Sequence, residues 1–251
     1  PSMNPKGTGW FPRPQPATTN MAQLFREAGY RTGLFANTPV MRFDGFDEGF
    51  DETGFFSDGF AAKPNTAKLT DRTAEFIETH RERPHLIYLH YVDPHIPYTP
   101  PAGYADRFRD KPQEERMLLH GDVLGKVVPL TQAGFGPGDA RLEDLVARYD
   151  GEIRFVDDEL RRLLEAMRAA GTADNTILVL TADHGEEWLE HGYFEHAWSV
   201  FEEVVHVPLI FWAPRLLEPA RCTEPVALVD LLPTLLALAN VSAARSDLDG
   251  A

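Results

Sequence analysis

A strand-like run that ends in Asp-His-Gly is the first stretch of this chain that could do chemistry. Residues 176–181 are apolar or β-branched, and Asp183-His184-Gly185 follows them almost at once. This composition is typical of a buried parallel strand, and open α/β sheets carry their chemistry at the carboxyl ends of such strands. A carboxylate and a neutral imidazole on adjacent residues can both face one cation if the backbone bends after them, which Gly185 permits. Asp183 and His184 are therefore candidate metal ligands.

A second chemical stretch follows another strand-like run. Residues 85–90 are largely apolar and lead directly into Asp93-Pro94-His95-Ile96-Pro97. The two prolines restrict the backbone on both sides of His95. The imidazole would therefore be presented with little conformational entropy left to lose.

Charge and composition exclude several classes of protein. The net charge of −15 repels phosphate backbones, so we expect no nucleic-acid partner, although a small anionic substrate can bind where a cation neutralises it. The single cysteine, Cys222, excludes an internal disulfide and a cysteine-rich zinc site. No apolar run approaches the ~20 residues of a membrane span. The compartment, whether periplasmic, extracellular or cytoplasmic, and the oligomeric state stay open.

Helix and strand patterns alternate along most of the chain. We expect a helix capped by Thr18 or Thr19 and closed by Gly29, then a strand over 31–37, and later a helix capped by Asn65. A long helix over 142–167 ends at Gly171, a strand covers 207–212, and Asp230 begins a last helix that runs to residue 239. The segment 43–60, rich in Phe and Gly, is expected to be a loop.

This alternation predicts an α/β fold with a mainly parallel sheet and helices on both faces. At 251 residues we expect one domain over residues 1–251. Residues 1–16 are an irregular lead-in, and residues 103–137 are a poorly patterned insertion or lid.

Taken together and in order, these motifs resemble the sulfatase family of the alkaline-phosphatase-like superfamily. The resemblance extends from about residue 17 to the end. It rests on Asp183-His184-Gly185-Glu186 and the Asp93–Tyr98 loop, and further on residues 24–35, Tyr149-Asp150-Gly151-Glu152-Ile153, Asp174-Asn175-Thr176 and residues 229–235. Several ordered motifs are far more specific than any one alone.

The resemblance implies a sulfuric ester hydrolase that transfers a sulfuryl group beside one divalent metal ion. Calcium is favoured, with magnesium, manganese or zinc as alternatives, and the substrate is a small anionic ester. Asp183 and His184 match two metal ligands of the family, and His95 matches a histidine that contacts the ester. His196 takes the place of a second substrate-contacting side chain and would act as donor or leaving-group acid.

Other polar residues near these motifs fit structural roles better. His191 follows Glu190 in a turn-like setting, so we expect it to be structural. Glu186 and Glu187 fit a solvated acidic turn better than a layer around the metal ligands.

The chain also departs from the family pattern. Family members begin with a strand that carries two adjacent aspartates and a helix that presents the nucleophile, and neither element lies here. Cys222 lacks the Cys-x-Pro-x-Arg arrangement of a family nucleophile. We therefore expect a fragment truncated at both ends, without the C-terminal subdomain, with weak metal affinity and no appreciable activity alone.

Three alternatives remain on the sequence. The same fold could serve a phosphodiesterase, phosphonate hydrolase or phosphomutase, and residues downstream of the nucleophile do not separate sulfate from phosphate. The chain could also be a non-catalytic binding module. Finally, the spacing of His184, His191 and His196 would allow a zinc site.

Overall fold

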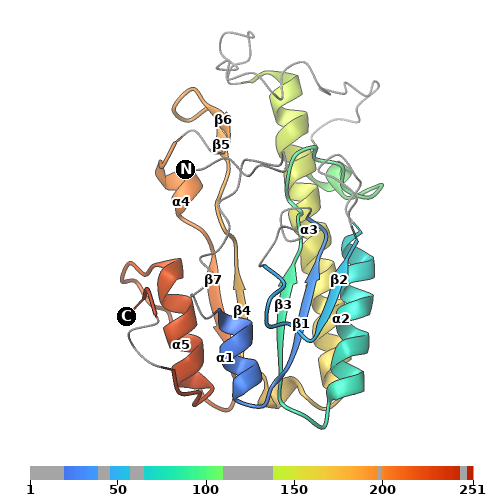
Figure 1. The fold of residues 1–251 in the computed structure, drawn as a ribbon. Helices are drawn as coiled ribbons and strands as arrows, with labels where there is room; N and C mark the ends of the chain where they lie inside the picture. Colours follow the sequence, from blue (N-terminus) through green and yellow to red (C-terminus); the bar gives the residue numbers. More distant parts are fainter. Residues whose placement is uncertain are drawn as a thin grey trace, which may run out of the picture. The chain divides into compact units, whose positions relative to one another are not determined.

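The computed structural model describes residues 20–38, 46–56, 65–109, 138–196, 199–243 and 248–250 (Figure 1). By internal contacts the chain divides into two compact units. Unit 1 comprises Pro1–Val92, Arg162–Asp174 and Glu218–Ala251, and unit 2 comprises Asp93–Arg161 and Asn175–Leu217. The lead-in at 1–16 and most of the expected insertion at 103–137 lie outside the described residues. The single domain expected over 1–251 stays a prediction.

Unit 1 contains a three-stranded parallel sheet in the order β2-β1-β3. The central strand β1, Arg31–Ala36, pairs along its whole length with β3, His85–His90, from Arg31 opposite His85 to Ala36 opposite His90. On its other side it pairs with β2, Glu52–Phe55. Five of the six residues of β1 are buried, as expected for a central parallel strand. The parallel α/β architecture predicted from the sequence is confirmed.

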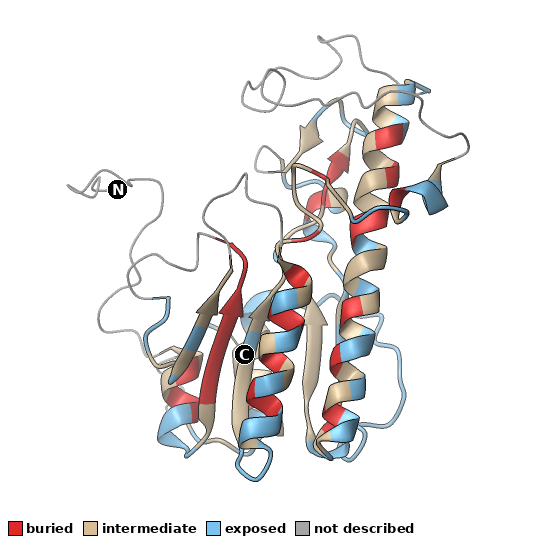
Figure 2. Ribbon diagram, turned by 90° about the vertical axis from the view of Figure 1, so that its right-hand side faces the viewer, coloured by how far each residue is buried: buried red, intermediate tan, exposed pale blue. Residues whose placement is uncertain are grey.

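Helices cover both faces of this sheet, and the side chains of β3 show why. Leu86 packs on the cluster that joins α1, Met21–Glu27, to α5, Leu231–Leu238. Ile87 and Leu89 point to the other face, where Phe35 packs against α2, Thr66–His80. Alternate residues of a strand point to opposite faces, so a run that is apolar throughout needs cover on both. Figure 2 shows the buried residues gathered along one side of α2.

The helix starts differ from the sequence expectation in detail. Asn20, not Thr18 or Thr19, caps α1: its Oδ1 accepts from Gln23 N, and the Gln23 side chain accepts from Asn20 N, each at 2.9 Å. Asn65 does occupy the position before α2, but its side chain donates to Phe56 O at 2.7 Å instead of capping the helix.

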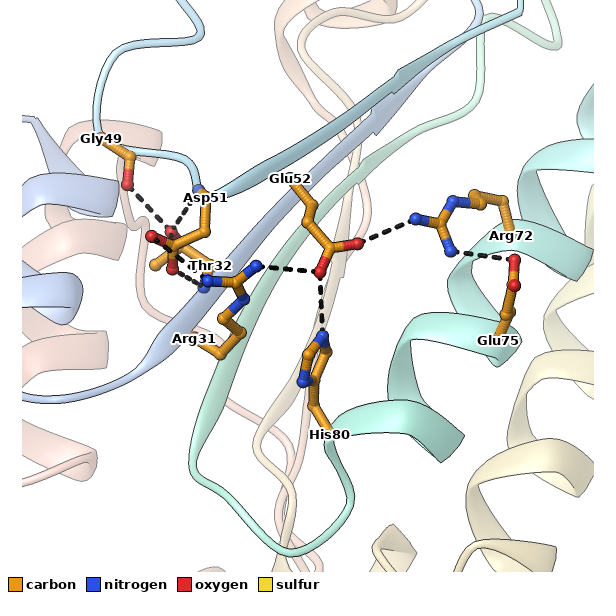
Figure 3. Close-up of polar contacts among 8 residues, drawn as sticks. All are labelled: Arg31, Thr32, Gly49, Asp51, Glu52, Arg72, Glu75 and His80. Carbon is orange, nitrogen blue, oxygen red and sulfur yellow. Dashed lines mark hydrogen bonds and ion pairs between the residues drawn. The ribbon is translucent and has the colours of Figure 1, made fainter.

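Strand β2 lies within the segment expected to be a loop, and polar contacts explain its presence. Glu52 accepts hydrogen bonds from Arg31 on β1 at 3.1 Å and from Arg72 on α2 at 2.8 Å, and it lies 3.0 Å from His80 (Figure 3). Burial alone would raise the pKa of Glu52, but His80 and Arg31 hold it below its ordinary value. The Phe35 ring also fills the space beside Gly54, where a Cβ would lie 2.9 Å from its Cδ1. Contacts distant in sequence therefore form this strand, not a local apolar pattern.

Unit 2 carries most of the long helix α3, Ala140–Ala169, which Gly171 follows with φ +73° as expected. Its strands are β4, Leu178–Thr181; β5, Glu187–Trp188; β6, Phe194–Glu195; and β7, Leu209–Trp212. Strand β4, expected to be buried and parallel, is half-buried and pairs antiparallel with β7. An apolar run predicts that a strand is covered, but not the direction of its neighbour.

Short elements complete the described structure. The 3-10 helix η2 covers Ala105–Phe108, η3 covers Ala173–Asn175, helix α4 covers Glu202–Val205, and η4 covers Leu228–Asp230 before α5. Strands β5 and β6 form a small antiparallel hairpin. Among the described residues, no helix combines the length and the apolar character needed to cross a membrane.

Candidate active site

His95 lies in the loop that follows β3, and its ring geometry fixes where the proton sits. The imidazole Nδ1 lies 2.6 Å from the main-chain carbonyl oxygen of Ile96. A carbonyl oxygen only accepts, so Nδ1 carries the hydrogen and Nε2 keeps its lone pair. Burial lowers the pKa of His95, and nearby His196 lowers it further against the opposing effect of the Ile96 carbonyl. His95 is therefore a neutral imidazole with a free Nε2.

Asp183 and His184 follow β4 and lie side by side. His184 Nδ1 lies 2.8 Å from the carbonyl oxygen of Gly185, so Nδ1 carries a hydrogen and Nε2 points away from this bond. His184 Nε2 lies 3.7 Å from Asp183 Oδ1, and that same carboxylate accepts the main-chain N–H of His184 at 3.1 Å. The Asp183 side chain is 73% exposed. An accessible carboxylate and an imidazole Nε2 thus lie side by side.

Gly185 is required here for close approach, and not for the sharp bend that the sequence suggested. A Cβ on Gly185 would lie 2.0 Å from the carbonyl oxygen of Glu203, and no positive φ accompanies the position. The Gly185 N–H donates to Val204 O at 2.7 Å. This contact holds the segment after Asp183-His184 against the backbone around helix α4.

His196 brings the two histidine-bearing segments together. Its ring stacks on that of His184, with 3.9 Å between centroids and 27° between planes. It also meets the His95 ring edge-on, with centroids 5.4 Å apart. The three imidazoles that the sequence singled out therefore form one cluster within unit 2, although residues 95 and 184 lie far apart in the chain.

Glu186 is a buried carboxylate bound to His196 of this cluster. The prediction of a solvated position for Glu186 was wrong. The residue is only 7% exposed, so Glu186 does not belong to a solvated acidic turn; Glu187 is fully buried and accepts from Ser199 Oγ at 2.8 Å. Glu186 accepts from Tyr98 Oη at 2.7 Å and from His196 Nδ1 at 3.0 Å. Buried carboxylates persist where donors satisfy them, and the hydroxyl of a buried tyrosine needs such a partner. Tyr98, beside Pro97, was the one signal in the sequence that could have revealed it.

The charge on His196 follows from these partners. Burial alone would lower its pKa, but the hydrogen bond and negative charge of Glu186, aided by Glu195 and Asp183, raise the pKa of His196 above its ordinary value. Because Glu186 binds Nδ1, the second hydrogen of the protonated ring sits on Nε2. The cluster thus combines one imidazole with a raised pKa and one, His95, with a lowered pKa. Such a divergence is the pattern expected of acid and base roles.

His191 lies apart from this cluster. Its Nε2 pairs with Glu203 at 3.4 Å, and its ring stacks on Phe201 with centroids 3.7 Å apart. These contacts fit the structural role expected for it. Among the described residues, no three His, Cys, Asp or Glu side chains come together as a metal site, so the zinc alternative built on His184, His191 and His196 is wrong.

Comparison with known proteins identifies the relatives of this chain. A family model described as Sulfatase matches residues 2–241. The chain is 28% identical over 243 residues to a protein named Sulfatase from Formosa agariphila, covering 88% of this chain and 47% of that protein. It spans between about a third and a half of the length of the first curated relatives that it matches.

Solved structures share the fold. Phosphonate monoester hydrolase from Silicibacter pomeroyi superposes with a TM-score of 0.72 at 22% identity, over 95% of this chain and 61% of that one. BT4656, solved with its substrate D-glucosamine-2-N,6-O-disulfate, gives a TM-score of 0.67 at 20% identity, over 92% of this chain and 63% of that one. At these identities the two likenesses show the fold alone.

Proposed function

Since this chain belongs to the sulfatase family, we propose that it serves in the hydrolysis of sulfate esters, with an anionic ester bound at the cluster of His95, His184 and His196. The observation that carries the proposal is the convergence of the three rings, with centroids 3.9 Å and 5.4 Å from that of His196. The structural neighbour BT4656 has a sulfated glucosamine as its substrate, so a sulfated sugar or a similar small ester is the first substrate class to test.

Asp183 and His184 would hold a divalent cation. The fit rests on chemistry present in the chain: an exposed carboxylate lies 3.7 Å from His184 Nε2, and the hydrogen bond from Nδ1 to Gly185 O orients the ring so that Nε2 could serve as the ligand atom. Two ligands make up only part of the shell of a hard cation, so further oxygen ligands are needed. Calcium is the first ion to test, and the mixed carboxylate–imidazole pair also suits manganese or zinc. When bound, such an ion stabilises negative charge on the ester oxygens.

His196 is the proposed acid for the departing oxygen. Glu186 holds the ring through Nδ1, so the proton on Nε2 can be donated to the leaving group. The same carboxylate favours the protonated ring, because its hydrogen bond and negative charge raise the pKa of His196 against the effect of burial.

His95 is the proposed contact to the ester group itself. In the neutral ring the Nε2 lone pair would face the sulfate oxygens, which are acceptors. An anionic ester therefore favours the protonated form of His95, whose Nε2–H can donate to it. Substrate binding and proton uptake by His95 would then be linked.

The test compares aryl sulfate, aryl phosphate and aryl phosphonate esters on metal-loaded protein in which this chain is joined to the nucleophile-bearing segment that the family requires. His95→Ala and His196→Ala should each lower kcat/KM for the aryl sulfate by roughly 10²- to 10⁴-fold. His191→Ala is the matched control, because His191 is near in sequence but pairs with Glu203; it should leave the rate within about threefold.

Two results would replace the proposal. Faster turnover of the phosphonate or phosphate ester would assign the chain to the phosphorus-ester hydrolases of the same superfamily. Sulfate binding without turnover of any ester would instead identify a binding module.

A further inference from the structure

Glu152, on helix α3, forms hydrogen bonds with the loop that carries His95. This glutamate is fully buried, and its Oε1 accepts the main-chain N–H of Thr99 at 2.5 Å. The main-chain N–H of His95 donates to the same carboxyl group. One side chain of α3 thus binds the loop at His95 itself and again four residues later, at the far end of the Pro94–Tyr98 turn.

The neighbouring residue Gly151 lets helix α3 lie close enough to the loop for these hydrogen bonds to form. A Cβ on Gly151 would lie 2.8 Å from the main-chain nitrogen of Ala105 and 3.1 Å from Cγ of Pro100. A side chain at 151 would push the segment that follows the loop away from the helix. Gly151 and Glu152 therefore act together. The absence of a side chain at Gly151 lets the loop backbone lie close to α3, and the carboxyl group of Glu152 binds that backbone.

The end of the loop next to Thr99 is also fixed by a second carboxylate, Glu186. The hydroxyl of Tyr98 donates to Glu186, which also holds His196. The Tyr98 ring meets Tyr149 of α3 edge-on, with centroids 5.6 Å apart. The loop is thus tied both to the helix and to the carboxylate that orients the second histidine, so a displacement on either side would change the spacing of the rings of His95 and His196.

Burial disfavours a charged glutamate at this point, although the charge of Arg148 offsets part of that cost. The second oxygen of Glu152, Oε2, has no hydrogen-bond partner in the described part of the chain, and the buried Asp93 lies near enough to raise the pKa of Glu152. Such a group is costly to bury, and an apolar residue would fill the same space in a helix more cheaply. An apolar residue could not accept the two hydrogen bonds that Glu152 accepts from main-chain N–H groups of the loop.

We propose that Glu152 is a positioning residue for His95, which sets the place of the His95 imidazole beside His196 by accepting the main-chain N–H groups of His95 and Thr99. The proposal rests on the role proposed above for His95. Glu152 itself does not touch the ester and takes no part in proton transfer.

The test compares Glu152→Leu and Glu152→Gln in the intact protein. Leucine has a similar volume but no acceptor, whereas glutamine keeps the Oε1 acceptor. We expect Glu152→Leu to speed hydrogen exchange of the His95 and Thr99 amides by roughly tenfold or more, and to shift the imidazole NMR resonances of His95. Glu152→Gln should restore both. Leu163→Ala, a large-to-small change at another buried position of α3, should lower stability without either effect.

Unchanged His95 resonances in a folded Glu152→Leu protein would overturn the proposal, as would failure of Glu152→Gln to restore them. If the leucine variant does not fold, the unmodified protein decides the matter: rapid exchange of the His95 and Thr99 amides would contradict the two hydrogen bonds. These readouts need no catalytic activity. A protein that turns over no sulfate ester would therefore defeat the proposed function and leave the positioning role open to its own result.

Discussion

Replacing Glu152 by glutamine should change how the stability of this protein depends on pH. Burial, reinforced by the negative charge of Asp93, raises the pKa of Glu152 from its ordinary 4.5 to about 9, against the opposing effect of the Thr99 and His95 amides. The folded protein therefore holds a proton on this carboxyl group across the neutral range, whereas the unfolded chain does not. Glutamine has a similar shape and never titrates.

The sign and size follow from this difference. A group whose pKa is raised on folding contributes its full stabilisation below its unfolded pKa, and that contribution is lost as pH rises toward its folded pKa. The window is therefore from about pH 4.5 to about pH 9. Within it each pH unit changes the free energy of unfolding by ~1.4 kcal/mol. Between pH 5 and pH 8 the unmodified protein should lose up to about 4 kcal/mol relative to Glu152→Gln.

Urea unfolding of both proteins at several pH values from 5 to 8 measures this quantity. The difference in slope is decisive, because any constant cost of burying the glutamine amide cancels. Glu75→Gln is the control, because this side chain on helix α2 is 67% exposed. Its free energy of unfolding should depend on pH in the same way as that of the unmodified protein. If the free energy of unfolding of Glu152→Gln also has the same pH dependence as that of the unmodified protein, Glu152 is ionised in the folded protein, and burial does not raise its pKa.

Three further outcomes are expected. Gly185→Ala should destabilise the protein by roughly 2 kcal/mol or more, because the new methyl group would overlap Glu203 O at 2.0 Å; an unchanged thermal midpoint would contradict this packing. Glu186→Gln should lower the pKa of His196 in an NMR titration, because the charge that raises it is removed, and an unaltered titration would refute the pairing. Inorganic sulfate should bind more tightly as pH falls through the pKa of His95, and calorimetry should detect proton uptake that His95→Ala abolishes.

The regular elements could be predicted where the pattern is local. Helix α3 and strands β1 and β3 follow from apolar spacing, and Gly171 marks the end of α3 as expected. Strand β2 was missed because an ion cluster around Glu52 forms it, and its partners on β1 and α2 lie about twenty or more residues away in sequence. Similarly, a polar residue one position further along, Asn20, took the cap expected of Thr18 or Thr19.

The residues of the site also differ in whether a local sequence pattern could identify them. His95 and His184 could be named from polar motifs that contain proline or glycine after strand-like runs, and His196 from the resemblance to the sulfatase family; the structure brings all three together. Glu186 and Glu152 could not be recognised. An acidic residue looks the same in a sequence whether water or a buried donor satisfies it, and only the fold supplies Tyr98 or the Thr99 amide as that donor.

These buried carboxylates also bear on how an acidic chain can bind an anion. With a net charge of −15 the protein as a whole repels a sulfate ester, so attraction must come from local positive charge. Within the imidazole cluster Glu186 raises the pKa of His196 and so favours its protonated form, whereas burial lowers the pKa of His95, whose protonated form an anion would favour. A divalent cation at Asp183 and His184 would add the remaining positive charge. Affinity for a sulfate ester should therefore depend jointly on metal and on proton concentration, and Glu186, although negative, supports binding through the proton it holds on His196.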